Sequence, residues 1–327
     1  MIDMVIESTL TNMTQLTLPN KSTLNPVKRQ STLNAPAMFA GVALHGGEHC
    51  RVVMKPAPVN SGITFVRTDV TDRDNLIKAR TDAVTGVKNC TTIANLAGIS
   101  VATIEHLMAA LCASGIDNVR VELDGSELPA LDGSAEPFLQ LIEQVGLVVQ
   151  PAQRRYIKAL KTVEVRQGKS YGKIEVSDRL KLDVTIDFED AAIGRQSLYF
   201  EPDVRSFRER LASARTFARM HEVDALLKAG LSKGGSLDNA VIVDGDKVLN
   251  PGGLRYVDEF VRHKALDLMG DLYIDGPLLA KVTTIRGGHG LNHALLTKFM
   301  ADSDAWKFET LPTPESLLHE TQTLARA

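Results

Sequence analysis

Three ionisable side chains recur every four residues in the stretch EFVRHKALDLMGD, and they are His263, Asp267 and Asp271. Side chains four residues apart lie on one face of an α-helix, so His263 and Asp267 can bind a single cation together. A nitrogen and an oxygen ligand suit Zn²⁺, and the spacing therefore predicts half of a zinc site. A partly exposed histidine beside a carboxylate is the alternative interpretation of the same spacing.

A second candidate lies in the apolar run ATIEHLMAAL, where Glu105 and His106 are neighbours. Burying a carboxylate and an imidazole is costly unless each has a partner. Neighbouring helix residues point about 100° apart, so His106 can bind a metal ion while Glu105 reaches a water molecule on it. The order is not HExxH, so the metalloprotease motif does not apply. A hydrogen-bonded core histidine with a peripheral glutamate is the alternative.

A third candidate is His289, which follows two glycines in TTIRGGHGLNHALL and stands just before an apolar-periodic helix. A helix N-terminus would lower the pKa of the imidazole, whereas a nearby carboxylate would raise it. Asp271 is the candidate for that carboxylate. If it dominates, His289 is protonated near neutral pH and can act as an acid. The alternative is a histidine that only caps the helix.

Composition limits the class of protein. The chain has 327 residues, of which 44% are hydrophobic and 24% charged, with a net charge of −3. It can build real cores, and it lacks the basic excess of a general nucleic-acid or anionic-membrane binder. Its three cysteines form no CxxC pair, which is typical of a reducing compartment. No apolar run approaches the ~20 residues of a membrane span, and MIDMVIESTL does not resemble a signal peptide. We therefore predict a cytoplasmic protein without stable membrane insertion.

Hydrophobic periodicity predicts the elements that must hold these residues. Strand-like runs begin near Lys28, among them RVVMKPA and GITFVRTD. The segments TVEVRQG, GKIEVSD and LKLDVTIDF predict a meander of consecutive strands. Additional strands are predicted at 117–123 and near 282–284. Helices are predicted at 102–114 (ending at Gly115), about 135–145, 204–213, 222–229, 258–270 and 290–301.

The pattern breaks at PAQRR, near residue 150, where we place a domain boundary. The predicted parts are a loosely ordered leader (1–27), an N-terminal α+β domain (28–150), a C-terminal α+β domain (151–305) and a tail (306–327). EHLMAALCASGIDNVRVEL and RHKALDLMGDLYIDGPLLAKV share one order, in which a helix with an early histidine precedes glycine and a strand. This weak repeat predicts two related halves, each supplying one histidine-bearing helix.

Several motifs occur in a characteristic order: ATIEHLMAAL, PALDGSAEPF, ARTFARM, GGSLDNAVIVD, VLNPGGLRYVDEFVRHKALDLMGDL and GGHGLNHAL. Together they resemble the zinc-dependent UDP-3-O-acyl-N-acetylglucosamine deacetylases, which carry out the committed step of lipid A biosynthesis in Gram-negative bacteria. The resemblance covers about residues 28–305. It implies two similar α+β domains, each a sheet packed against helices with a small insert, and an active site between them.

The resemblance also implies roles for individual residues. The Zn²⁺ ligands would be His106, His263 and Asp267, with water completing the site. Glu105 would be the general base. His289 would be the general acid or electrostatic partner, held by Asp271, and the hydroxyl of Thr216 would stabilise the oxyanion. Departures from the family pattern, such as Ala43 for a usual glycine and Arg286 for a common lysine, touch none of the implied ligands.

Substrate contacts are implied for a further set of residues, namely Phe217, Lys264, Arg286 and His45. Either Lys169 or Lys173 would lie near the diphosphate. The segment 220–236 would line an apolar passage for the acyl chain. The implied partner is the UDP-linked acylated amino sugar, and we expect a monomer. Two alternatives stay open, a non-catalytic sugar-nucleotide or acyl-binding module and a zinc amidase acting on another N-acetyl sugar.

Overall fold

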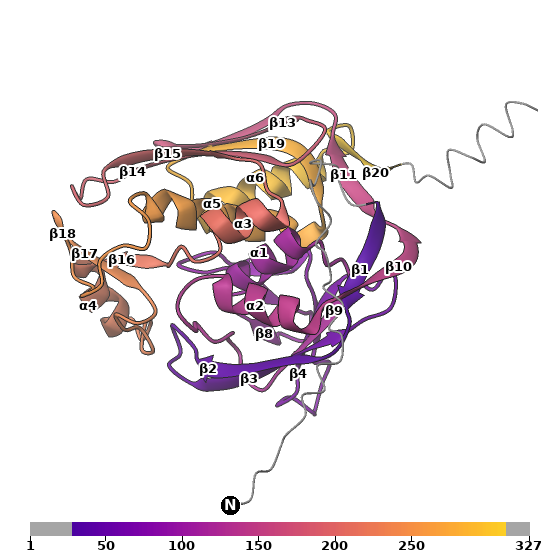
Figure 1. Ribbon diagram of the computed structural model, residues 1–327, viewed down its shortest axis with the longest axis horizontal. Helices are drawn as coiled ribbons and strands as arrows, with labels where there is room; N and C mark the ends of the chain where they lie inside the picture. Colours follow the sequence, from indigo (N-terminus) through magenta and orange to yellow (C-terminus); the bar gives the residue numbers. More distant parts are fainter. Residues whose placement is uncertain (1–27, 312–327) are drawn as a thin grey trace, which may run out of the picture.

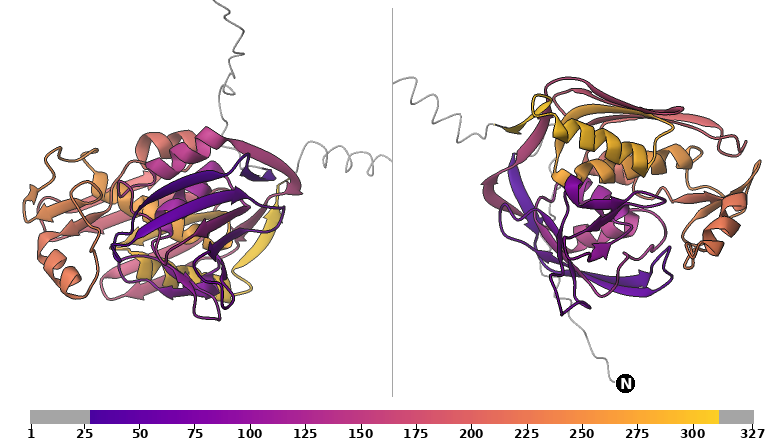
Figure 2. Two further views of the ribbon diagram at one scale, coloured as in Figure 1. Left: turned by 90° about the horizontal axis from the view of Figure 1, so that it is seen from below. Right: turned by 180° about the vertical axis from the view of Figure 1, so that it is seen from behind.

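The computed structural model describes residues 28–311, and the predicted leader and most of the predicted tail lie outside this range. Two β-sheets enclose a set of helices between them (Figure 1). Figure 2 shows the layers again from behind, and from below it shows the strands of the N-terminal half in front of the helices. The prediction of two similar α+β halves is confirmed by the sheet order in each half, described next.

The sheet of the N-terminal half has the order β2-β3-β9-β4-β5. Strand β9 is inserted from later in the chain, antiparallel to β3 and parallel to β4. Alternate residues of β3 are buried, as expected for a strand with one face on a core. The bounds are β2 (Ala37–Val42), β3 (His49–Pro56), β4 (Ile63–Arg67), β5 (Leu76–Lys78) and β9 (Val119–Leu123).

The C-terminal half repeats this order as β12-β13-β19-β14-β15. Strand β19 is antiparallel to β13 and parallel to β14. The predicted meander is therefore wrong, because β19, a strand from about a hundred residues later, separates the second of its three strands from the third. The bounds are β12 (Val163–Gln167), β13 (Ser170–Val176), β14 (Lys181–Asp187), β15 (Arg195–Phe200) and β19 (Leu278–Ile285). Strands β11 (Arg155–Ala159) and β20 (Trp306–Thr310) extend this sheet beside β19.

The central helices are α1 (Glu105–Ser114) and α5 (Glu259–Leu272), which pack against each other between the sheets. Nearly every residue of both helices is buried, because the other half covers the face that a surface helix would turn to water. Gly270 lets the two helices approach closely, because a Cβ atom there would overlap the backbone carbonyl of Glu105 and lie 3.1 Å from the Ala109 nitrogen.

The start of α1 was predicted three residues too early. Thr103 has φ +59°, a left-handed conformation that no α-helix contains, so the helix begins only at Glu105. Its end is as predicted, since Gly115 adopts φ +71° and its N–H bonds to the carbonyl oxygen of Cys112. The helix therefore presents Glu105 and His106 in its first turn.

Each half carries an insert before its central helix, and further helices complete the layers. The N-terminal insert is β6 (Val84–Gly86), β7 (Thr92–Ala94) and β8 (Ser100–Val101); the C-terminal one is β16 (Phe217–Arg219), α4 (Met220–Lys228), β17 (Val241–Asp244) and β18 (Lys247–Val248). The remaining helices are α2 (Glu136–Val145), α3 (Val204–Arg210) and α6 (His289–Ala301), with short 3₁₀ turns η1 (Thr81–Ala83) and η2 (Tyr273–Asp275).

The predicted domain boundary stays a prediction. Strand β10 (Leu147–Gln153) pairs with β1 (Arg29–Leu33), whereas β11, which begins at Arg155, pairs with β19 and β20. The pairing partners thus change at Arg154, a few residues after the predicted point. Within residues 28–311, no helix is long and apolar enough to cross a membrane.

Candidate active site

The contact between α1 and α5 brings the three predicted metal ligands together. The imidazoles of His106 and His263 have ring centroids 5.0 Å apart. Asp267 Oδ1 lies 3.5 Å from His106 Nε2 and 3.3 Å from His263 Nε2. All three residues are buried, and each offers one ligand atom within 4.8 Å of the others. Two helices far apart in the sequence therefore form one compact set of nitrogen and oxygen donors.

The chemistry of these donors favours a cation between them. His263 Nδ1 lies 3.0 Å from the Ala214 carbonyl oxygen, which can only accept a hydrogen bond, so Nδ1 carries the hydrogen. Burial lowers the pKa of His263 to about 3, which leaves Nε2 as a bare acceptor. That acceptor faces Asp267 Oδ1, which is buried and has no hydrogen-bond partner among the described residues. A metal ion would satisfy both atoms at once.

Glu105, His289 and Asp271 lie directly beside this set. His289 is the first residue of α6, and its Nδ1 lies 2.8 Å from Asp271 Oδ2. Its other nitrogen, Nε2, lies 3.8 Å from Glu105 Oε1 and 4.0 Å from Asp267 Oδ2. The contact between His289 and Asp271 that the sequence predicted is therefore present, and Nε2 of the imidazole lies within 4.0 Å of both Glu105 and the predicted ligand Asp267.

Burial and neighbouring charges shift the pKa values of His289 and Glu105. Burial lowers the pKa of His289, but the carboxylates of Asp271 and Glu105 outweigh it and raise the value to about 10. Burial also raises the pKa of Glu105, against the opposing charge of His289. At neutral pH, His289 can thus donate a proton from Nε2, while Glu105 sits in surroundings that favour proton uptake.

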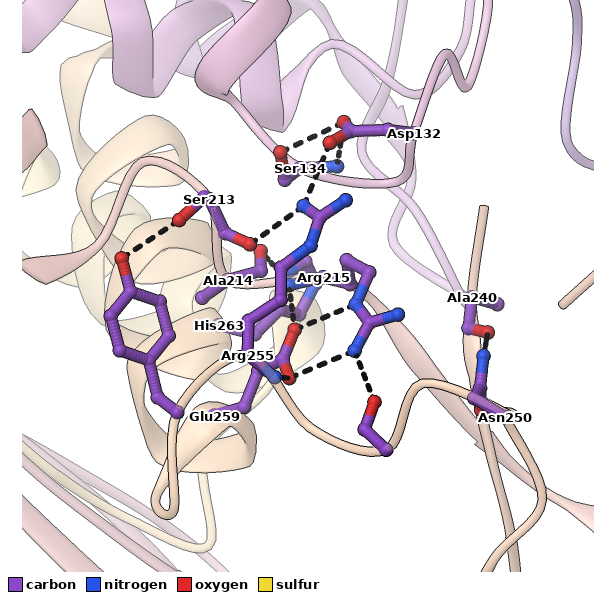
Figure 3. A network of polar contacts seen from close by, with 12 residues as sticks. Asp132, Ser134, Ser213, Ala214, Arg215, Ala240, Asn250, Arg255, Glu259 and His263 are labelled. Atoms are coloured by element: carbon purple, nitrogen blue, oxygen red, sulfur yellow. Dashed lines mark hydrogen bonds and ion pairs between the residues drawn. The ribbon is translucent and has the colours of Figure 1, made fainter. Parts of the chain in front are cut away.

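The segment 213–216 is fastened to α5 by a buried ion pair that sequence reasoning missed (Figure 3). Glu259 is fully buried one turn before His263, and its carboxylate accepts from Nε, Nη2 and the backbone N–H of Arg215 at 2.8, 3.1 and 3.0 Å. The backbone N–H of Arg255 donates to the same carboxylate. The pair therefore fixes the two residues that flank Arg215, which are Ala214, the partner of His263, and Thr216.

The predicted substrate-contacting residues divide into those next to the metal-ligand set and those away from it. The ring of Phe217 lies 6.3 Å from that of His263, and Lys264 Nζ lies 5.4 Å from the Phe217 centroid and 2.7 Å from Asp267 Oδ2. His45 is buried, with both ring nitrogens unpartnered among the described residues. Arg286 forms an ion pair with Asp187 instead of contacting the ligand set.

Thr216 is placed by backbone hydrogen bonds. Its N–H donates to the Gly133 carbonyl oxygen at 2.8 Å, and its own carbonyl accepts from the Val241 N–H at 2.7 Å. Thr216 therefore joins the DGS turn of the N-terminal half to the insert of the C-terminal half. In the chain it stands between Arg215, the partner of Glu259, and Phe217, whose ring lies 6.3 Å from that of His263.

Two further polar residues around Asp271 escaped sequence reasoning. Asn292 Nδ2 donates to Asp271 Oδ2 at 2.8 Å, and Thr91 Oγ1 donates to Asp271 Oδ1 at 2.6 Å. Asn292 stands three residues after His289 on α6, so its helical spacing was a usable indication. Thr91 lies in a loop 180 residues from its acceptor, and local spacing could not have found it.

Comparison with known proteins identifies the family of the chain. Residues 30–301 match the family model described as UDP-3-O-acyl N-acetylglycosamine deacetylase. A UDP-3-O-acyl-N-acetylglucosamine deacetylase of Phenylobacterium zucineum is 47% identical over 282 residues, covering 86% of this chain and 96% of the relative. One of Neisseria meningitidis is 43% identical over 281 residues, covering 85% of this chain and 92% of the relative. The motif-based resemblance is thereby confirmed, and the chain belongs to the family of UDP-3-O-acyl-N-acetylglucosamine deacetylases.

Proposed function

We propose that this chain hydrolyses the N-acetyl group of UDP-3-O-acyl-N-acetylglucosamine, a step of lipid A biosynthesis, with Zn²⁺ held by His106, His263 and Asp267. The products are acetate and the UDP-3-O-acyl-glucosamine. The observation that carries the proposal is the buried Asp267 Oδ1, which has no hydrogen-bond partner among the described residues and faces two imidazoles, with Glu105 and His289 beside it. A binding module would need no such pair of acid and base next to a cation site.

The chain's own groups supply the proton transfers. The bound ion would polarise the acetamide carbonyl and lower the pKa of a water molecule. Glu105 would take the proton of the attacking water on Oε1, since Oε2 already accepts a hydrogen bond from the Thr91 N–H. The Thr216 hydroxyl would donate to the developing oxyanion. His289 would deliver the proton on Nε2 to the leaving amine, while Asp271 holds its other nitrogen.

Substrate recognition is proposed from position and charge. Lys264 and Phe217, next to the ligand set, would contact the sugar nucleotide. His45 would offer its two ring nitrogens, which have no hydrogen-bond partner within residues 28–311. Of the two candidate lysines, we favour Lys169, because Lys173 Nζ already contacts Glu175 at 3.0 Å. Lys169 stands in the β12–β13 turn beside Arg286, whose carbonyl oxygen accepts from Ser170 Oγ. The apolar residues of 220–236, which include the half-exposed Leu227, would face the acyl chain.

Metal analysis of the purified protein, paired with an acetate-release assay, tests the proposal. We expect one bound divalent ion per chain, loss of acetate release after chelation, and recovery on adding Zn²⁺. Side-by-side assays with added ferrous iron identify the better ion. UDP-N-acetylglucosamine without the acyl chain is the comparison substrate. Stoichiometric metal without acetate release would contradict the proposed reaction, and equal rates on both substrates would contradict the acyl specificity.

Replacing Asp271 by asparagine is expected to move the alkaline limb of the pH–rate profile to lower pH. The carboxylate is the largest influence that raises the pKa of His289 to about 10, so its removal lowers that pKa and deprotonates the acid earlier as pH rises. Each pKa unit corresponds to about 1.36 kcal/mol, and we expect a shift of about one unit or more. The profile of kcat from pH 6 to 11 measures it. An unmoved limb would contradict the role of His289, and Asp275→Asn is the matched control.

Replacing Arg215 by lysine is expected to weaken metal binding about 10- to 100-fold, as substitutions behind a metal ligand typically do. Lysine keeps the charge but cannot donate the two guanidinium hydrogen bonds to Glu259. The neighbouring Ala214 carbonyl, which accepts from His263 Nδ1, would then no longer be fixed in place. Competition with a chelator measures the affinity. The control is Arg205→Lys, whose partner Glu209 forms an exposed ion pair of little expected value. Equal metal affinity in the two variants would contradict the expectation.

The cytoplasmic location and the monomeric state stay predictions.

A further inference from the structure

Thr91 binds both carboxylates that flank His289. It lies in the loop before β7 and is 4% exposed. Its backbone N–H donates to Glu105 Oε2 at 3.0 Å, and its hydroxyl donates to Asp271 Oδ1 at 2.6 Å. One residue of the N-terminal insert therefore touches the proposed base on α1 and the carboxylate on α5 that orients the proposed acid.

These contacts close a ring of four residues. Starting from Thr91, the ring passes through Glu105, then across 3.8 Å from Glu105 Oε1 to His289 Nε2, then from His289 Nδ1 to Asp271 Oδ2, and back to the Thr91 hydroxyl. The bonds to Thr91 occupy Glu105 Oε2 and Asp271 Oδ1. The atoms that are left to exchange protons with a substrate, Glu105 Oε1 and His289 Nε2, face each other.

The hydroxyl has one hydrogen and two neighbours. It lies 2.6 Å from Asp271 Oδ1 and 3.4 Å from His289 Nδ1, and the shorter distance to a charged acceptor identifies the bond it makes. Asp271 Oδ2 already accepts from His289 and Asn292. Without the Thr91 hydroxyl, Oδ1 would be a buried acceptor short of its donor, and the carboxylate would turn away from the orientation that His289 needs.

We infer that Thr91 is a positioning residue for the reaction. It orients the carboxylates of Glu105 and Asp271 so that the proposed base, Glu105, and the proposed acid, His289, face the same position in the site. The inference rests on the proposed function of this site. The bond from the Thr91 backbone N–H to Glu105 is kept by any substitution other than proline, so the inference concerns the Thr91 hydroxyl. The residue before α1 holds the loop in turn, since the Ile104 N–H donates to the Thr91 carbonyl oxygen at 3.4 Å.

The test replaces Thr91 by valine, which keeps the shape and removes the hydroxyl, and by serine, which keeps the hydroxyl. We expect Thr91→Val to lower kcat about 10- to 100-fold, with KM within about threefold and metal content unchanged. Thr91→Ser is expected to recover most of kcat. Thr32→Val is the matched control, because the Thr32 hydroxyl is also buried and accepts from the Ala57 N–H without touching the site.

A double-mutant comparison separates positioning from loss of folding. Thr91→Val should cost much less in an Asp271→Asn background than in the wild type, because both changes act through the same carboxylate. Should the valine variant fail to fold, Thr91→Ala and Thr91→Ser give the same comparison. If the wild-type protein releases acetate and Thr91→Val is equally active, this inference is wrong, whereas the proposed function stands because the wild type performs the reaction. A serine variant as impaired as the valine variant also overturns it.

Discussion

Replacing Glu105 by glutamine is expected to lower kcat by about 10²–10⁴-fold, the range that a positioned general base contributes. Glutamine keeps the shape of the side chain and can still accept from the Thr91 N–H through its amide oxygen, but it cannot take a proton. Glu105 is not among the predicted metal ligands, so metal content should stay stoichiometric. Acetate release under substrate saturation and metal analysis of the same preparation measure the two quantities.

The matched control for this substitution is Glu136→Gln. Glu136 also stands in the first turn of a helix, α2, but its Oε1 accepts from Gln140 Nε2 and its side chain contacts no residue of the proposed site. We expect its kcat to equal that of the wild type. If Glu105→Gln turned over as fast as this control, another group would have to activate the water. If it lost its metal, the effect on kcat would no longer report on the base.

Replacing Gly270 by alanine is expected to destabilise the protein and to lower kcat about 100-fold. The added Cβ would overlap the carbonyl of Glu105 and lie 2.9 Å from its carbon, so α1 and α5 must move apart. Overpacking of this kind costs about 1–3 kcal/mol, and a displacement of about 1 Å in catalytic groups costs about 10²-fold in rate. Because Gly270 stands between Asp267 and Asp271, the displacement reaches both.

Thermal unfolding and kcat of the same variant test this expectation. Gly290→Ala is the control for stability, since Gly290 is also helical but its Cβ would find only an ordinary contact at 3.8 Å with Val87. There, alanine should be neutral or stabilising, because glycine in a helix costs about 0.5–1 kcal/mol relative to alanine. A Gly270→Ala protein with wild-type stability and turnover would show that the two helices can separate without cost.

Local pattern predicted most of the elements of this fold, because each helix and strand leaves its periodicity in the sequence. The helix at 258–270 and the strands RVVMKPA and GITFVRTD were placed within a few residues. Strand order was not predictable in this way. The residues of β14 alternate correctly for a strand, but nothing in that alternation says that β19 will lie between it and β13. The weak repeat predicted two related halves, but it did not predict this insertion.

The same distinction between local pattern and tertiary contact applies to the residues of the site. The spacing of His263 and Asp267 predicted a shared face, since both stand on one helix. That His106 joins them depends on a tertiary contact, and the family resemblance supplied it. The pair Arg215–Glu259 links residues 44 positions apart, and the bond from the Thr91 hydroxyl to Asp271 links residues 180 positions apart. Such links leave no periodic trace, because a backbone N–H or a guanidinium can meet its acceptor from any distance along the chain.

The duplicated strand order has a consequence for how this enzyme can fail. The N-terminal half contributes His106, and the C-terminal half contributes His263 and Asp267, so neither half alone contains the complete candidate metal site. Cleavage of the polypeptide between the halves would leave two fragments that each keep a sheet and a central helix, yet catalysis would return only on their reassociation. Turnover in such a split protein would then vary with fragment concentration, as in a bimolecular complex, and an ion bound at the proposed site would stabilise the association of the two fragments.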